Sequence, residues 1–287
     1  MHSITAKSIL SPNNGMNLYR GCTHGCIYCD SRSQCYGMTH TFEDVGVKRN
    51  APQLLEEALR KKRSRCMIGT GSMTDPYLPL EKTEGLTRCA LELIDRYGFG
   101  FSVITKSDLV LRDLDLLQRI HHRAKCVVQM TLTTYDEDLC RILEPNVATT
   151  RRRFEVLMEL KKVGIPTVVW MTPILPFLSD TEENIRGLLD YCGQAEVKGI
   201  LTFGIGMTLR SGNREYFYQK LDEHFPGMKR EYMRVFGTSY GIHSPNGKVL
   251  GKLVKDFCKE HHILCGTQAI FNDLHTLDET ETQLSLF

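Results

Sequence analysis

Three cysteines within eight residues constrain this chain of 287 residues more than any other feature. Cys22, Cys26 and Cys29 follow the spacing C-x3-C-x2-C, which places three thiolates in one short loop. A [4Fe–4S] cluster usually takes four protein thiolates. A cluster held by these three would leave one iron free to bind another ligand, so the spacing favours an iron–sulfur site with one open position.

Zinc is the main alternative metal for this loop. The three cysteines would then need a fourth ligand, for which His24 and Cys35 are the candidates. Structural zinc sites are most often built from two separated pairs such as C-x2-C, and the chain contains no second pair. Disulfides are not expected, because three clustered cysteines cannot all pair among themselves and the composition is typical of a cytosolic protein.

Composition narrows the class of protein further. The chain has 36 Lys and Arg against 34 Asp and Glu, a formal charge of +2, which makes no overall electrostatic case for nucleic acid binding. Its first residues lack the basic and apolar regions of an export signal, and no apolar run approaches the ~20 residues of a membrane span. With eleven cysteines, these features predict a cytoplasmic location and no membrane association.

Short apolar runs alternate with amphipathic helical stretches along the first 224 residues. Repeated strand–helix units with short connections are typical of a parallel sheet with right-handed crossovers. The predicted strands are 18–19, 66–69, 99–105, 126–131, 166–171 and 199–204, and the predicted helices are 52–62, 81–97, 113–121, 149–163, 181–192 and 213–224.

Six such units predict an α/β fold, a partial (β/α)6 barrel of the TIM type. Ligands gather at the C-terminal ends of the strands in such barrels, and the cysteine loop follows the first predicted strand. The barrel is expected to span residues 1–227. We expect a helical C-terminal extension over 228–271, because no strand–helix alternation is visible there. A flexible acidic tail is expected over 272–287.

Residues 22–29 match the signature of the radical S-adenosylmethionine (SAM) superfamily. The resemblance implies that a [4Fe–4S] cluster is held by Cys22, Cys26 and Cys29, and that SAM chelates the open iron. Cluster reduction, by an electron donor such as flavodoxin or ferredoxin, then splits SAM to a 5′-deoxyadenosyl radical. In this family an apolar or aromatic residue at the position of Tyr28 packs near the adenine.

Loops at the ends of predicted strands supply further candidates for SAM binding. Thr70 and Ser72 belong to a Gly/Ser/Thr loop, G-T-G-S-M-T-D-P-Y, and its counterpart in the family meets the SAM amino group. Lys106 follows the next strand, where its charge can neutralise a carboxylate. Pro173 belongs to the turn T-P-I-L-P, whose apolar wall is suited to adenine.

Over residues 15–205 the chain resembles the spore photoproduct lyase-like subgroup, often labelled DNA repair photolyases. The resemblance rests on S-M-T-D-P-Y, T-K-S, the turn P-I-L-P and L-E-P followed by two arginines. It implies a DNA substrate. In the lyase the loop after the second strand carries a hydrogen-donating cysteine, but here residues 69–80 contain none. Tyr77, Tyr135 or a cysteine from another strand could take the place of that cysteine.

Two further features concern charge and partners. Arg151, Arg152 and Arg153 begin a predicted helix, where the helix dipole disfavours cations, so a partner is expected: SAM, Glu144 or a phosphate. The last five residues, Q-L-S-L-F, resemble the peptide that docks bacterial repair proteins on the β sliding clamp. The residues expected to contact the clamp are Gln283, Leu284, Leu286 and Phe287.

Two other functions stay open. One is radical SAM modification of a peptide, a tRNA or a small metabolite. The other is a non-catalytic iron–sulfur protein docked on the sliding clamp.

Overall fold

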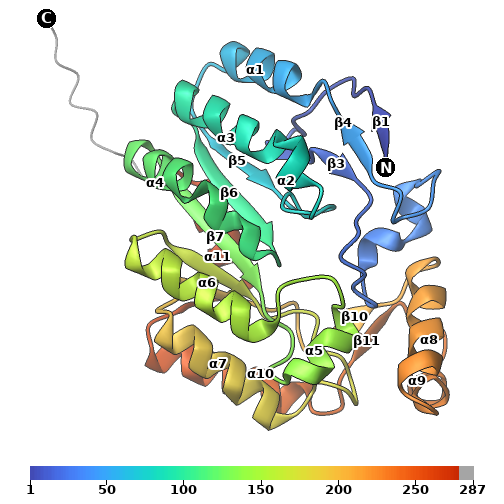
Figure 1. Ribbon diagram of the computed structural model, residues 1–287. Coiled ribbons are helices and arrows are strands. Elements are labelled where there is room, and N and C mark those ends of the chain that lie inside the picture. The colour runs from blue at the N-terminus through green and yellow to red at the C-terminus, as the bar shows by residue number, and fades with distance from the viewer. Residues whose placement is uncertain (278–287) are drawn as a thin grey trace, which may run out of the picture.

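Seven parallel strands form the central sheet of the computed structural model, which describes residues 1–277 (Figure 1). Every neighbouring pair in this sheet is parallel, and the strands lie side by side in chain order. The α/β class predicted from the sequence is therefore confirmed. The strands are β2 (Gly15–Met16), β5 (Met67–Thr70), β6 (Gly100–Thr105), β7 (Cys126–Thr131), β8 (Thr167–Trp170), β9 (Gly199–Leu201) and β12 (Leu264–Cys265).

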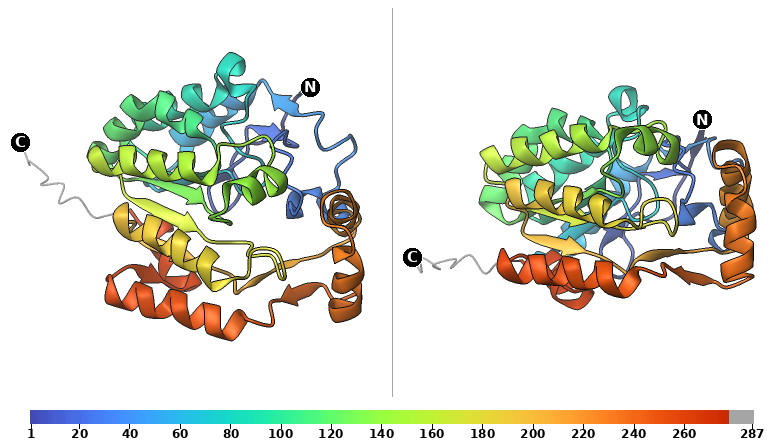
Figure 2. Two further views of the ribbon diagram at one scale, coloured as in Figure 1. Left: turned by 60° about the horizontal axis from the view of Figure 1, so that its bottom comes forward. Right: turned by 90° about the horizontal axis from the view of Figure 1, so that it is seen from below.

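A layer of helices covers the outer face of the sheet (Figures 1 and 2). Each of these helices contributes buried aliphatic side chains to the main core. They are α1 (Ala51–Lys61), α3 (Leu86–Tyr97), α4 (Leu114–Arg123), α6 (Thr150–Lys162), α7 (Glu182–Gln194) and α10 (Gly247–Glu260). None of the helices in residues 1–277 is long and apolar enough to cross a membrane.

The inner face of the sheet is covered at one end only. Side chains alternate along β7, so Val128 packs in the main core while Val127 packs against Ile270 and Leu274 of α11 (Thr267–His275). Thr131 lies on the same face as Val127, four residues along the strand, and lines a cavity. Helix α11 therefore fills the inner face near the strand beginnings and leaves the C-terminal ends open.

The first strand differs from the prediction. Residues 18–19 do not enter the main sheet; Gly15–Met16 forms the edge strand β2 instead. Tyr19–Arg20 is β3, which runs antiparallel to β4 (Gly46–Lys48) in a small sheet completed by β1 (His2–Ile4). The cysteine loop therefore follows β3. Two-residue strands have no readable periodicity, so the sequence pattern could not separate β2 from β3.

The C-terminal segment also differs from the prediction, because it is not wholly helical. Leu264 pairs with Gly199, so β12 adds a seventh strand beside β9. Cys265 pairs with Ile200 in the same ladder. Because β12 has only two residues and forms by pairing with the free edge of β9, its own residues give no pattern that would predict a strand.

The helix predicted over residues 81–97 is divided in two. Gly85 has φ +63°, a left-handed conformation that suits glycine, and it separates α2 (Glu81–Glu84) from α3. The buried Glu81 carboxylate accepts hydrogen bonds from the Thr87 N–H (3.1 Å) and so satisfies a free donor at the start of α3.

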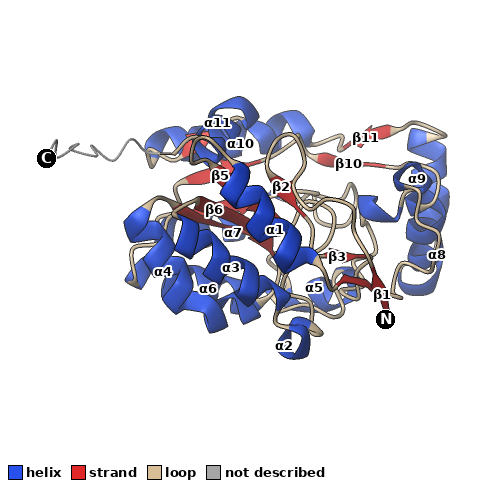
Figure 3. Ribbon diagram, turned by 90° about the horizontal axis from the view of Figure 1, so that it is seen from above, coloured by secondary structure: helices blue, strands red, loops and turns tan. Residues whose placement is uncertain are grey.

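A second layer of structure stands over one end of the sheet. The antiparallel ribbon of β10 (Gly206–Thr208) and β11 (Gly241–His243) lies next to α8 (Asn213–His224) and α9 (Met228–Phe236), which are side by side in Figure 3. Aromatic side chains of α8 and α9 pack with Cys26, Ile27 and Tyr28 in a separate cluster. This layer therefore supports the cysteine loop. The remaining short helix is α5 (Glu137–Leu143).

Candidate active site

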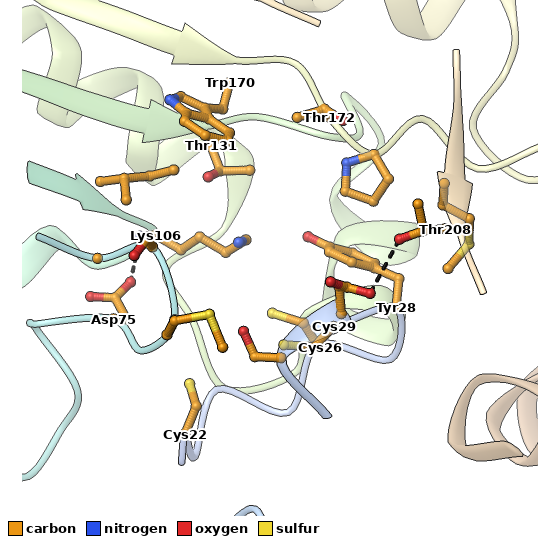
Figure 4. A pocket seen from close by; sticks show the side chains of 18 of the residues that line it. Cys22, Cys26, Tyr28, Cys29, Asp75, Lys106, Thr131, Trp170, Thr172 and Thr208 are labelled. Atoms are coloured by element: carbon orange, nitrogen blue, oxygen red, sulfur yellow. Dashed lines mark hydrogen bonds between the residues drawn. The ribbon is translucent and has the colours of Figure 1, made fainter. Parts of the chain in front are cut away.

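A cavity of about 370 Å³ opens at the C-terminal ends of the parallel strands (Figure 4). Its walls come from the cysteine loop, the loop after β5, the ends of β6, β7 and β8, and the β10–β11 ribbon. The sheet therefore brings together segments that are distant in the sequence, as expected for a site at this edge of a parallel sheet.

Cys22, Cys26 and Cys29 all line this cavity (Figure 4). The Cys22 N–H donates to the Phe42 carbonyl (2.9 Å) and the Ile27 N–H to the Leu143 carbonyl (3.0 Å), which anchors the loop on two sides. Burial, together with the nearby Cys29, raises the pKa of Cys22 to about 12. None of the eleven cysteines is in a disulfide.

The spacing of the three sulfurs distinguishes a cluster from a single zinc ion. Ligand atoms bound to one Zn²⁺ at ~2.3 Å lie no more than ~4.6 Å apart. Among residues 1–277, one group of three or more potential ligands gathers within 4.8 Å, and it consists of His2, His40 and Asp44 rather than the cysteines. Three thiols around one cavity, spread more widely than a single ion requires, fit a [4Fe–4S] cluster better than zinc.

Asp75 joins three elements at the edge of the cavity. Its carboxylate accepts hydrogen bonds from the Thr105 hydroxyl (2.8 Å) and from the N–H groups of Lys106 and Tyr77 (both 2.8 Å). His24 Nδ1 of the cysteine loop lies 3.5 Å from the same carboxylate. Burial lowers the pKa of His24, which favours the neutral imidazole. One carboxylate therefore holds the loop after β5 against the end of β6 and the cysteine loop.

A buried ion pair lies behind the cysteine loop. Glu144 accepts hydrogen bonds from the Tyr28 hydroxyl and from the Arg153 guanidinium, and the Glu144 and Arg153 side chains are both fully buried. Arg153 also donates to the Thr131 carbonyl (2.6 Å) at the end of β7. Of the partners considered for the arginine run, Glu144 is therefore the one that Arg153 contacts. The pair fixes the position of the Tyr28 ring.

Lys106 carries the positive charge nearest to Tyr28 within the cavity. Its Nζ lies 5.8 Å from the centre of the Tyr28 ring, and Figure 4 shows the chain extending across the cavity. Burial acts to lower the pKa of Lys106, but Cys26 and Glu144 together raise it above its ordinary value. Lys106 is therefore a cation at neutral pH, suited to binding an anionic group.

The wall opposite the cysteine loop is held by a polar ladder across three strands. The Trp170 indole N–H donates to the Gln129 amide oxygen (2.6 Å), and the Gln129 amide N–H donates to the Ser102 hydroxyl (2.7 Å). Phe203 packs edge-on against Trp170, with ring centres 5.6 Å apart. This arrangement presents two oriented aromatic rings to the cavity, where they can stack against a flat ligand.

The predicted cofactor-binding residues divide into two groups. Tyr28, Ser72, Lys106 and Pro173 line the cavity together with the three cysteines. Thr70 does not line it; the residue ends β5 with a buried hydroxyl that has no hydrogen-bond partner within residues 1–277.

Neither tyrosine that was considered as a hydrogen donor lines the cavity. Tyr77 is fully buried in the main core, and Tyr135 is 40% exposed and packs on Tyr191, with ring centres 5.2 Å apart. Asp75 and Tyr36 also line the cavity, although neither was predicted from the sequence as a site residue. Asp75 stands in the S-M-T-D-P-Y motif, which was a usable signal, whereas Tyr36 has no sequence context that marks it.

Comparison with known proteins decides the family. Residues 16–192, more than half of the chain, match the family model described as the radical SAM superfamily. This chain belongs to the radical SAM superfamily. It is therefore a radical SAM enzyme, and the cofactors of its family are a [4Fe–4S] cluster and SAM.

Two relatives of this radical SAM chain illustrate its range. An uncharacterised protein of Mycobacterium tuberculosis is 28% identical over 255 residues, which cover 82% of this chain and 73% of the relative. An uncharacterised protein of Methanocaldococcus jannaschii is 34% identical over 171 residues, 58% of this chain and 62% of the relative.

Solved structures show that the fold of this chain is shared with spore photoproduct lyase. A spore photoproduct lyase mutant superposes with a TM-score of 0.64 over 90% of this chain and 77% of its own, at 14% identity.

Proposed function

We propose that Cys22, Cys26 and Cys29 hold the [4Fe–4S] cluster and that SAM fills the adjoining part of the same cavity. The observation that carries this proposal is the position of three free thiols along one side of a cavity at the C-terminal edge of the sheet. When bound, the cluster and SAM supply an electron and a radical that abstracts hydrogen. This chemistry also requires an electron donor, for which a flavodoxin or ferredoxin is suited.

The residues around the thiols would bind and orient SAM. Lys106 offers a cation for the carboxylate. Its backbone N–H donates to Asp75, and its Nζ lies 5.8 Å from the centre of the Tyr28 ring. Ser72 offers a hydroxyl from the loop after β5, and Pro173 offers an apolar surface after β8. A charge-assisted contact of this kind is about twice as strong as a neutral hydrogen bond.

We further propose that the substrate is a nucleic acid, with DNA as the first choice. One spore photoproduct lyase structure with the same fold, at a TM-score of 0.62, contains AdoMet together with a dinucleoside spore photoproduct. The aromatic wall of Trp170 and Phe203 supports this choice, because bases stack on exposed aromatic rings.

The reaction is expected to differ from that of spore photoproduct lyase. Residues 69–80 contain no cysteine, and among the residues that line the cavity the cysteines are the three proposed ligands. The aliphatic hydroxyl of Ser72 in this loop is a much poorer hydrogen-atom donor than a thiol S–H. The product radical would therefore be quenched by another group, so the chemical outcome is a repair or modification of a different kind.

An anaerobic assay with the reconstituted protein tests the substrate class. DNA deuterated on its sugars and bases is incubated with SAM and a chemical reductant, and 5′-deoxyadenosine is analysed by mass spectrometry. Deuterium in 5′-deoxyadenosine is expected for DNA. If deuterium is transferred from labelled tRNA, a peptide pool or small metabolites and not from DNA, that labelled compound class is the substrate and DNA is not.

The sliding clamp is the proposed partner. The peptide Gln283–Phe287 lies outside the described residues, so this proposal rests on its sequence alone. Clamp binding by the full chain is compared with that of a variant lacking residues 283–287, by surface plasmon resonance. Binding that is lost on deletion is expected; equal binding by both proteins, or none by either, would refute clamp docking through this peptide.

A further inference from the structure

A row of lysines follows one side of α10. Lys248, Lys252 and Lys255 stand at positions i, i+4 and i+7, which face the same way on an α-helix. All three are exposed. Seven residues of helix rise ~10 Å, so the three ammonium groups form a short positive line rather than a single charge.

These lysines line a groove that meets the candidate active site. The groove runs between α10, the loop after β9 and the loop that begins α11, and its lining includes Gly247 and Gly251 of α10. Phe203 lines both this groove and the cavity with the cysteines. In Figure 2, α10 follows β11 along one edge of the molecule. A ligand in the groove would therefore pass directly to the cavity beside Phe203.

The charge of the groove is mostly unneutralised within the described residues. Lys252 forms an ion pair with Asp256, which also lines the groove. Lys248 and Lys255 form no ion pair with any residue in 1–277. Since the chain as a whole is close to neutral, this concentration of positive charge at the entrance to the cavity favours an anionic ligand.

The exposed ring of Phe203 favours an anionic ligand that also carries bases. Its side chain is 54% exposed, although large aromatic side chains are usually covered. It is supported from behind by Trp170 and by Phe271, whose ring centre lies 6.4 Å away in a stacked arrangement. A supported aromatic face beside a row of cations is the combination that binds unpaired bases and their phosphates.

We propose that this groove binds a single-stranded segment of polynucleotide, with the three lysines on its phosphates and Phe203 under a base, and directs it into the cavity. The inference rests on the proposed nucleic acid substrate and adds the route that the substrate takes. A single strand is favoured over a duplex, because stacking on Phe203 requires a base that is not paired.

The test measures binding of a fluorescent oligothymidylate by anisotropy at several salt concentrations. Replacement of Lys248, Lys252 and Lys255 by glutamine is expected to weaken binding about 50-fold at 0.15 M salt and to reduce the log–log salt slope by ~2, because each phosphate contact contributes ~0.7. The matched control replaces Lys61, Lys82 and Lys162, which are exposed on other helices, and is expected to bind like the wild type.

A second variant tests the aromatic part. Phe203→Ala is expected to weaken binding about tenfold and to leave the salt slope unchanged, because stacking releases no counterions. Circular dichroism checks that each variant is folded.

The outcomes separate this inference from the proposed function. If the lysine variant binds like the control while the wild type binds well, the groove assignment is wrong and the nucleic acid substrate stands. If the wild type does not bind oligonucleotide at all, the groove assignment and the nucleic acid substrate are both wrong. An assay of SAM cleavage then tests the radical chemistry separately. Stronger binding of poly-glutamate than of oligothymidylate, or of duplex than of single strand, would overturn the assignment to a single strand.

Discussion

Arg153, in the first turn of α6, pairs with Glu144 in the interior, and both side chains are completely buried. The pair lies directly behind Tyr28, whose hydroxyl donates to the same carboxylate. Burial acts to raise the pKa of Glu144, but Arg153 and Lys106 hold it below its ordinary value. The ionised Glu144 carboxylate thus accepts hydrogen bonds from Arg153 of the helix layer and from Tyr28 of the cysteine loop, and so links the two.

Arg153→Met is expected to destabilise the protein by about 3–5 kcal/mol, because it leaves the Glu144 charge buried without its partner. Urea unfolding followed by circular dichroism measures the loss. Arg152→Met is the control: Arg152 is only partly buried and pairs with Asp108 (3.0 Å), so its loss should cost no more than ~1 kcal/mol. Equal stability of the two variants would contradict the assigned role of Arg153.

The pH dependence of stability should also show the contribution of the Glu144–Arg153 ion pair. The folded-state pKa of Glu144 is lowered, so its contribution is fully present above the unfolded value of ~4.3 and is lost as the pH falls through the folded-state pKa. The melting temperature of the wild type should therefore fall more steeply below about pH 4 than that of Glu144→Gln. Parallel profiles for the two proteins would show that Glu144 does not contribute in this way.

Single replacement of Cys22, Cys26 or Cys29 by alanine is expected to remove most of the bound iron and the visible absorption of the reconstituted protein, because each thiolate holds a different iron. Iron and sulfide analysis measures the loss. Cys35→Ala is the control, since Cys35 is exposed and outside the cavity. Full iron content in any of the three variants would exclude that residue as a ligand.

Gly71→Ala should disrupt the loop after β5. Gly71 has φ +100°, and a Cβ atom there would lie 2.1 Å from the Ile104 carbonyl oxygen. Strained backbone of this kind costs ~1–3 kcal/mol, so both stability and SAM affinity should fall. Gly69→Ala is the matched control, because nothing lies within 4 Å of the added atom. Similar thermal melts and SAM titrations for the two variants would contradict this reading of the loop.

Lys106→Gln is expected to weaken SAM binding by about 10- to 100-fold, because it removes a hydrogen bond between two charged groups. Calorimetric titration of the reconstituted protein measures the affinity. Lys48→Gln is the control, because Lys48 is also half-buried but lies outside the cavity. An unchanged dissociation constant for Lys106→Gln would show that Lys106 does not contact SAM.

Local patterns predicted much of the helix layer correctly. The helix expected over 149–163 is α6, Thr150–Lys162, because the Thr149 hydroxyl accepts the Arg152 N–H at its start. The two-residue strands β2 and β12 were missed, because their stability comes from pairing with β5 and β9 rather than from their own residues.

The sequence alone determined the three-cysteine loop and the repeated strand–helix units, since both depend on residues close together in the chain. Only the tertiary structure decided which side chains meet at the site. It brought Tyr28, Lys106 and Asp75 to the cysteines and kept Tyr77 in the core. Contacts between distant segments depend on packing and burial, which the spacing of residues along the chain does not specify.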